Sequence, residues 1–278
     1  MKPIHIKELD QTFTTKEELF RALKMNESKI LSLKRASIYE SEKKGQIAPL
    51  ELLKTEDAEK AEFTKSGYVY PVVNTTNFYD SHQDVHFPGI WNKSAREQNG
   101  RIHYVFDHDL KVSSVIAWPS DVNILVKSIP WSYLGYNYPG NTEALIYEIE
   151  EAKIENQAAL DVFKKRKPVQ NSIRMQYETI RLGINSNEKE YVENNQYYHS
   201  RIGEIVNRDA VEEYGFFFGV ETAKIIKEGS MVLFGSNSAT PIIYHQEAGQ
   251  TTSDDANKQQ PGTPIVDYTK LQKVNFFQ

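Results

Sequence analysis

The spacing of hydrophobic and polar positions changes near residue 66. Before it, apolar residues recur every three to four positions, as expected for amphipathic helices. Thr14 or Thr15, followed closely by glutamates, is a typical helix start. Residues 1–65 are therefore predicted to be a helical N-terminal segment, with a second charged helix over 50–61. Such a segment suits either a removable or partner-binding arm or a helical cap on the main domain.

After residue 66 the pattern becomes that of strands, with β-branched and aromatic runs bounded by Gly, Pro, Asn and Asp. Residues 74–89 are predicted to be loop, and 185–220 a polar, then helical, insertion. Apolar residues four apart, with Pro168 as a stop, predict a helix over 142–165. The predicted strands span 68–73, 101–106, 112–118, 123–129, 169–184 and 223–234.

The last part of the chain returns to polar composition. Residues 245–278 form a polar tail whose first part has too little apolar content to order itself, so we expect a largely disordered segment. Its final residues, 266–277, regain aliphatic and aromatic side chains and would suit a short docking peptide. The main domain is thus expected to span residues 66–244.

Composition narrows the classes of function. The 278 residues carry a net charge of −5 and contain no cysteine, which removes disulfides, thiolate zinc sites and a cysteine nucleophile. Covalent catalysis would have to use Ser, Thr, Lys or a carboxylate. The mild acidity gives no electrostatic case for a specific nucleic-acid partner. No apolar run approaches the roughly 18 residues of a membrane helix, and the N-terminus lacks a signal-peptide core, so we expect a cytoplasmic protein with no membrane partner.

Three residues in or beside predicted strands are candidates for catalysis. His108 follows the strand over 101–106, Ser172 lies near the start of the strand over 169–184, and Glu228 lies within the strand over 223–234. Each alone has an ordinary structural explanation as a solvated turn, a structural hydroxyl or an exposed strand glutamate. A serine and a histidine gain meaning only as a pair within hydrogen-bond reach, with a third group to orient the imidazole.

A second set of histidines and aspartates suggests a different chemistry. Without cysteine, a cluster of imidazoles and carboxylates could hold zinc or another divalent metal. The four-residue spacing of His82 and His86 suits one helix face, although Pro88 and Gly89 indicate a loop. A metal hydrolase is therefore an alternative that these residues would have to support: His82, His86, His103, His108, Asp80, Asp84 and Asp107.

The order of these segments resembles the prohead proteases of tailed phages, relatives in fold of the herpesvirus maturation protease assemblin. The resemblance covers about residues 66–241 and rests on four short motifs in family order. They are an Asp-rich loop and Pro-Gly segment (Asp80 to Val85, then Pro88-Gly89-Ile90-Trp91), a strand ending in His108-Asp109, a strand headed by Ser172-Ile173-Arg174-Met175, and Glu228-Gly229-Ser230-Met231-Val232 running into Gly235-Ser236-Asn237.

The resemblance implies an α+β fold with a compact, mainly antiparallel β-barrel wrapped by helices. It implies Ser172 as nucleophile, His108 as general base and later acid, and Glu228 as the residue that fixes the imidazole tautomer. Backbone N–H groups near Ser172 would stabilise the oxyanion, and Arg174, two residues further along the same strand face, is a possible helper.

The resemblance also implies a setting. The protease would cleave scaffolding protein, capsid-protein arms and itself inside the assembling procapsid in the host cytoplasm, with self-association possible and no cofactor. Two departures from the family pattern motivate an alternative. Arg174 replaces a small residue and Gly229 replaces an aliphatic one, so the chain could instead be a catalytically inactive structural or scaffolding protein of the virion with the same fold.

Overall fold

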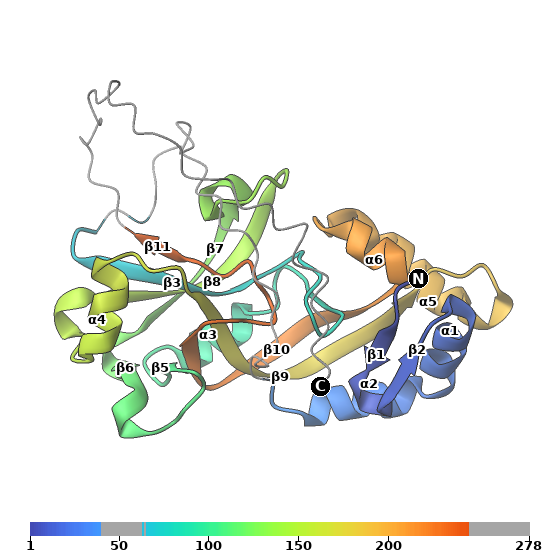
Figure 1. Ribbon diagram of the computed structural model, residues 1–278, viewed down its shortest axis with the longest axis horizontal. Helices are drawn as coiled ribbons and strands as arrows, with labels where there is room; N and C mark the ends of the chain where they lie inside the picture. Colours follow the sequence, from blue (N-terminus) through green and yellow to red (C-terminus); the bar gives the residue numbers. More distant parts are fainter. Residues whose placement is uncertain (40–62, 64, 245–278) are drawn as a thin grey trace, which may run out of the picture. The chain divides into compact units, whose positions relative to one another are not determined.

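The computed structural model describes residues 1–39, 63 and 65–244 (Figure 1). The predicted helix over 50–61 and the polar tail over 245–278 lie outside these residues. Within them the chain is α+β, with six α-helices and sheets of two, five and four strands. None of the helices in the described ranges has the length and apolar character needed to cross a membrane.

The N-terminal segment combines a β-hairpin with two helices. Its elements are β1 (Ile4–Ile6), β2 (Gln11–Phe13), α1 (Lys16–Met25) and α2 (Glu27–Ala36). The helix start predicted at Thr15 is confirmed, because its hydroxyl accepts a hydrogen bond from the Glu18 N–H at 3.3 Å. The β1–β2 hairpin had no counterpart in the helical pattern, because its two strands of three residues are too short to show an alternation.

The five-stranded sheet is built around a long antiparallel ribbon. Its strands are β4 (Asp84–His86), β10 (Phe216–Val232), β5 (His103–Phe106), β6 (Val115–Ala117) and β9 (Gln170–Ile184). β9 and β10 run side by side (Figure 1), while β4 and β5 pair in parallel with the other edge of β10. Strands predicted over 101–106 and 169–184 are confirmed, whereas only 115–117 of the strand predicted over 112–118 is strand, because residues 112–114 form a 3₁₀ turn. The strand predicted over 223–234 begins earlier, and β4 lies in a stretch predicted to be loop.

The four-stranded sheet has the order β11 (Ile242–Tyr244), β3 (Tyr68–Thr75), β8 (Asn141–Glu150) and β7 (Asn123–Pro130). β8 overturns the helix predicted over 142–165, of which only α4 (Gln157–Lys164) is helical. The spacing of Leu145 and Ile149 misled the prediction, because a step of four is even and falls on one face of a strand as well. Residues 144–147 are all buried, because alternate side chains of β8 enter two hydrophobic clusters on its opposite faces.

The expected β-barrel is wrong, because no sheet among the described residues closes on itself. A barrel requires its first and last strands to pair. Here β11 pairs only with β3 and β7 only with β8, so the four-stranded sheet has two edges. The five-stranded sheet is also not antiparallel throughout, since β4 and β5 run parallel to β10.

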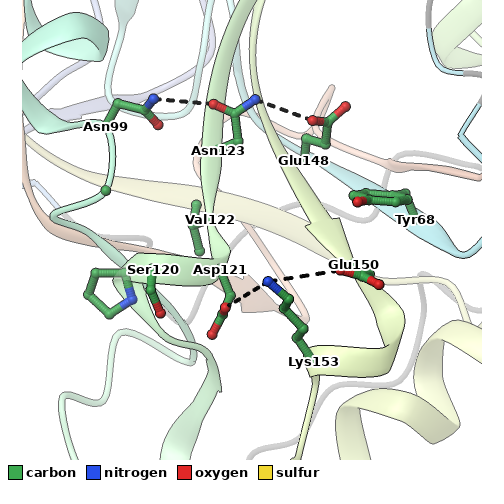
Figure 2. Close-up of a pocket in the computed structure, with 11 residues that line it drawn as sticks. Tyr68, Asn99, Ser120, Asp121, Val122, Asn123, Glu148, Glu150 and Lys153 are labelled. Atoms are coloured by element: carbon green, nitrogen blue, oxygen red, sulfur yellow. Dashed lines mark hydrogen bonds and ion pairs between the residues drawn. The ribbon is translucent and has the colours of Figure 1, made fainter.

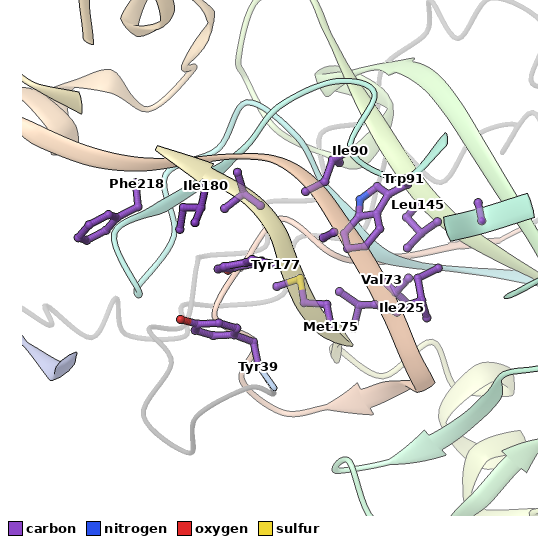
Figure 3. Packing of buried hydrophobic residues seen from close by; sticks show 14 of the residues in the cluster. Tyr39, Val73, Ile90, Trp91, Leu145, Met175, Tyr177, Ile180, Phe218 and Ile225 are labelled. Carbon is purple, nitrogen blue, oxygen red and sulfur yellow. The ribbon is translucent and has the colours of Figure 1, made fainter. Parts of the chain in front are cut away.

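A continuous hydrophobic core lies against the β9–β10 ribbon. Figure 3 shows Trp91, Leu145 and Val73 meeting Ile225 of β10, with Tyr177 and Met175 of β9 beside them. The remaining helices are α3 (Asn92–Gln98), α5 (Val192–Arg201) and α6 (Arg208–Tyr214). The last two lie within the predicted insertion over 185–220, and β10 begins inside it.

A buried ion pair fixes the N-terminal segment to the five-stranded sheet. Lys34 of α2 is 1% exposed, and its Nζ lies 2.7 Å from Asp84 Oδ1 and 3.4 Å from Glu8 Oε1. The ammonium also lies 4.4 Å from the centre of the Phe218 ring, a cation–π contact. Burial acts to lower the pKa of Lys34, but Asp84 and Glu8 oppose it and the pKa is raised. Residues 1–39 are thus packed into the fold, as in the cap interpretation.

Candidate functional site

His108 sits in a strained turn at the end of β5. Asp107 and His108 both have left-handed backbone angles, with φ of 48° and 56°, which side chains other than glycine rarely adopt. Three hydrogen bonds hold the turn: Asp107 N–H to Met231 O at 3.0 Å, Asp109 N–H to Phe106 O at 2.8 Å, and His108 N–H to Ser230 Oγ at 3.1 Å. Strain of this kind persists only where the surroundings determine the backbone, and it concentrates at functional sites.

Glu228 is directed at this turn by an irregularity in β10. The register with β9 shifts between Ile225 and Gly229, and Lys227 inside the shift has a φ of 66°. Such bulges re-aim side chains. The Glu228 side chain is fully buried, and its Oε1 lies 2.7 Å from His108 Nδ1. Its other oxygen, Oε2, accepts a hydrogen bond of 2.6 Å from the Ser230 hydroxyl.

The carboxylate determines which imidazole nitrogen can act as a base. An ionised carboxylate only accepts hydrogen bonds, so His108 Nδ1 must carry the proton that lies against Glu228. In the neutral ring, Nε2 is then the unprotonated nitrogen, the one that can accept a proton. The His108 side chain is 4% exposed and Glu228 is 0% exposed, so the contact is shielded from solvent screening. This is the arrangement of an oriented general base.

Ser172 is brought to the same place by sheet register. It lies directly opposite Ser230 in the antiparallel pairing of β9 and β10. Opposed residues project to the same face with Cβ atoms about 4.5–5.5 Å apart. Ser172 therefore shares a sheet face with Ser230 and Glu228, at the end of β5 that carries His108. The structure thus brings His108 and Glu228 into contact, and sheet register puts Ser172 opposite Ser230, the residue that contacts both.

Ser230 is the residue that sequence reasoning missed. It is part of the Glu228-Gly229-Ser230 motif, but no role was predicted for it from the sequence. In the structure its hydroxyl contacts both Glu228 and the His108 backbone. The available signal was the spacing, because residues two apart in a strand project to the same face. Nothing in the local sequence indicated that the His108 N–H would point there.

The departure at Gly229 has a packing explanation. A Cβ built at Gly229 would lie 2.6 Å from Cε2 and 2.7 Å from the hydroxyl of Tyr147. Tyr147, from β8, is fully buried and packs edge-on against Tyr104 with ring centres 6.0 Å apart. Its ring occupies the space that an aliphatic side chain at 229 would need. Glycine at this position is therefore compatible with an intact site. Arg174 follows Ser172 by two residues in β9, so both are on one face.

The histidines proposed for a metal site are not brought together. His103 begins β5 and packs edge-on against Trp118 at 5.7 Å, whereas His82 and His86 lie near Asp80 and β4. Among the residues that the structure describes, no group of three or more His, Asp or Glu is arranged to hold a metal ion. Burial and the nearby Asp84 carboxylate raise the pKa of Asp80 to about 6.

His86 instead belongs to a directed hydrogen-bond chain. The Trp91 indole donates to Asn74 Oδ1 at 3.0 Å, and the Asn74 amide faces His86 Nδ1 at 2.8 Å. His86 Nε2 lies 3.3 Å from the Tyr177 hydroxyl, which itself donates to Asp84 at 2.7 Å. Each donor is used once if His86 is neutral with its proton on Nε2. Burial, aided by nearby cations, lowers the pKa of His86 to about 3.

Figure 2 shows a separate surface pocket, whose lining residues Asn99 and Gly100 precede β5, whereas His108 follows it. The pocket has a volume of about 320 Å³. Its charged groups contact one another: Lys153 lies 3.5 Å from Asp121 and 3.9 Å from Glu150, and the Asn123 amide donates to Glu148 at 3.2 Å. The pocket is thus distinct from the Ser172–His108–Glu228 site.

Comparison with models of protein families, with curated proteins and with solved structures found no match to this chain.

Proposed function

We propose that this protein is a serine endopeptidase with Ser172 as nucleophile, His108 as general base and acid, and Glu228 as the orienting carboxylate. The contact between His108 Nδ1 and Glu228 Oε1, at 2.7 Å within a buried site, carries the proposal. It places the proton of the neutral imidazole on Nδ1, so that Nε2 is the nitrogen that would exchange a proton with Ser172. The register of β9 against β10 supplies the serine on the same face.

The reaction follows from these roles. His108 Nε2 takes the proton of the Ser172 hydroxyl as its oxygen attacks a peptide carbonyl, giving a tetrahedral intermediate. His108 then returns the proton to the leaving amine, the C–N bond breaks, and an acyl-serine forms. Water attacks the ester in the same way and frees Ser172. Glu228 stabilises the imidazolium at each stage without taking its proton.

Ser172, not Ser230, is the better nucleophile. The Ser230 hydroxyl donates its only proton to Glu228 and accepts the His108 N–H, so its proton is already directed at the carboxylate and not at the imidazole. Ser230 is also fully buried, whereas Ser172 is 7% exposed. The nucleophile must reach both a substrate carbonyl and the imidazole, and Ser172 at the start of β9 fits that requirement.

The order of motifs supports a specific setting for the proposed enzyme. As in the prohead proteases that the chain resembles, its substrates would be the scaffolding and capsid proteins, and the protease itself, inside an assembling procapsid in the host cytoplasm. Glycine at 229, the departure that Tyr147 explains, no longer favours an inactive structural protein. That protein is the alternative against which the experiment is designed.

The test is co-expression of the chain with its own scaffolding and capsid proteins. The wild type should cut at least one partner, and Ser172→Ala and His108→Ala should leave all partners intact. Ser132→Ala and His199→Ala, which change exposed residues of the same types, serve as matched controls and should cut normally. Particles that assemble with every partner uncut by the wild type would instead identify a structural component.

A further inference from the structure

Ser230 links the proposed base, His108, to Glu228, the carboxylate that would orient it. Its Oγ donates to Glu228 Oε2 at 2.6 Å and accepts the backbone N–H of His108 at 3.1 Å. We propose that Ser230 is a positioning residue of the site, holding the Glu228 carboxylate and the His108 turn in one fixed geometry. This inference rests on the proposed function and names a fourth residue on which it depends.

The hydroxyl has no role in forming the strand itself. Ser230 lies inside β10, with Val105 of β5 on one side and Ser172 of β9 on the other, and it is fully buried. Apolar residues usually fill such central positions, and a buried hydroxyl requires hydrogen-bond partners. Both partners here belong to the candidate site. The serine is therefore explained by what it holds, not by the needs of the sheet.

The two bonds act on different degrees of freedom. The bond to Glu228 fixes the rotation of the carboxylate, so that its other oxygen stays aimed at His108 Nδ1. The bond from the His108 N–H supports a left-handed backbone, with φ of 56°, that is unfavourable without compensation. Loss of the hydroxyl would release both together, and the imidazole would lose its fixed direction.

Two measurements on the full-length chain test the proposal. The first is the rate at which a fluorophosphonate probe labels the enzyme, as the serine oxygen displaces fluoride from phosphorus. The second is the hydrogen-exchange rate of the His108 Nδ1 proton, seen by NMR and assigned by its loss in His108→Gln. Outer contacts that orient a catalytic group typically contribute about 10- to 100-fold in activity. Ser230→Ala should slow labelling by that factor and accelerate Nδ1 exchange at least about tenfold.

Matched variants separate positioning from general destabilisation. Ser94 is also a buried serine whose hydroxyl accepts a backbone N–H of β10, that of Ile225, at 2.8 Å. Ser94→Ala should lower the melting temperature but leave the labelling and exchange rates unchanged. Ser230→Thr retains a hydroxyl and should restore both rates to within about threefold of the wild type, less than half of the effect expected on a logarithmic scale.

The outcomes distinguish the two proposals. Equal Nδ1 exchange in the wild type and Ser230→Ala would overturn the positioning role. Faster exchange in Ser230→Ala, with no labelling of Ser172 even in the wild type, would support the positioning role and defeat the peptidase. Equal losses of labelling in Ser230→Ala and Ser94→Ala would show that both serines act only through stability.

Discussion

His108 Nδ1 lies 2.7 Å from Glu228 Oε1, although 120 residues separate them in the sequence. The parallel pairing of β5 with β10 creates this contact, because it brings Phe106 opposite Met231 and so sets the turn after β5 beside the end of β10. Both residues reach each other from irregular backbone, one from a left-handed turn and one from a bulge. The contact is therefore built by the fold and not by a chance encounter of surface side chains.

Replacing Glu228 with glutamine should reduce activity far more than stability. The amide keeps the size of the side chain, but its NH₂ group would donate to Nδ1 and move the imidazole proton to Nε2, which removes the base. Loss of general-base catalysis is worth on the order of 10²–10⁴-fold. Fluorophosphonate labelling measures the loss, and thermal unfolding is the control. If Glu228→Gln is labelled at the wild-type rate, Glu228 does not orient the base.

The left-handed turn predicts that two substitutions of Asp107 will differ in their effect on stability. Asp107 is exposed and has a φ of 48°. Asp107→Val places a β-branched side chain in this region and should destabilise the protein by about 1–2 kcal/mol. Asp107→Gly fits the backbone and should change stability little. Urea unfolding compares the two variants, and equal stabilities would contradict the strained turn. Fluorophosphonate labelling should also fall in Asp107→Val, because residues 107 and 108 form one turn and a shift at 107 moves the imidazole.

The buried Lys34–Asp84 pair should make the N-terminal helices essential to stability. Lys34→Met keeps the length of the side chain but leaves Asp84 buried without its cation, which should cost about 3–5 kcal/mol. Asp84→Asn combined with Lys34→Met should recover part of that loss, because the fully buried position 84 no longer carries an unpaired charge. Lys29→Met, on the exposed face of α2, is the control. Urea unfolding of the wild type, Lys34→Met, Asp84→Asn and the double variant measures the coupling, and additive losses would argue against a buried pair.

The depressed pKa of His86 predicts a loss of stability in mild acid. The pKa of His86 in the folded protein, about 3, lies below its ordinary value of 6.5. Between these two pH values the unfolded chain therefore binds a proton at His86 and the folded protein does not. Stability contributed by neutral His86 is present above pH 6.5 and is lost as the pH falls toward 3, by about 2 kcal/mol between pH 8 and pH 5.

A histidine variant isolates this effect from its neighbours. Asp80 acts in the opposite direction, because its raised pKa of about 6 makes protonation favour the folded state. His86→Gln removes only the first contribution. The free energy of unfolding, measured from pH 8 to pH 5, should therefore fall less steeply in His86→Gln than in the wild type. Parallel curves would show that His86 has the same pKa in the folded protein as in the unfolded chain.

Most residues of the candidate site could be named from the sequence, but the strand pairing that brings them together could not. His108 and Ser172 could be named because each lies at a strand end that local composition marks. β8 was missed because its apolar residues fit a helix face and a strand face equally well. The barrel was wrong because the sheets of the described residues stay open, and which distant strands pair is not encoded in any local pattern. The role of Ser230 could not be predicted, because it depends on the direction of the His108 N–H in the folded turn.

The contact between Gly229 and Tyr147 has a consequence for the history of such chains. The two residues share one volume, so a side chain can enlarge at one position only as the other shrinks. In descendants and relatives of this chain, an aliphatic residue at 229 should accompany a smaller residue at 147. The Glu-x-Ser motif and the middle of β8 are expected to covary, although about 80 residues of sequence lie between them.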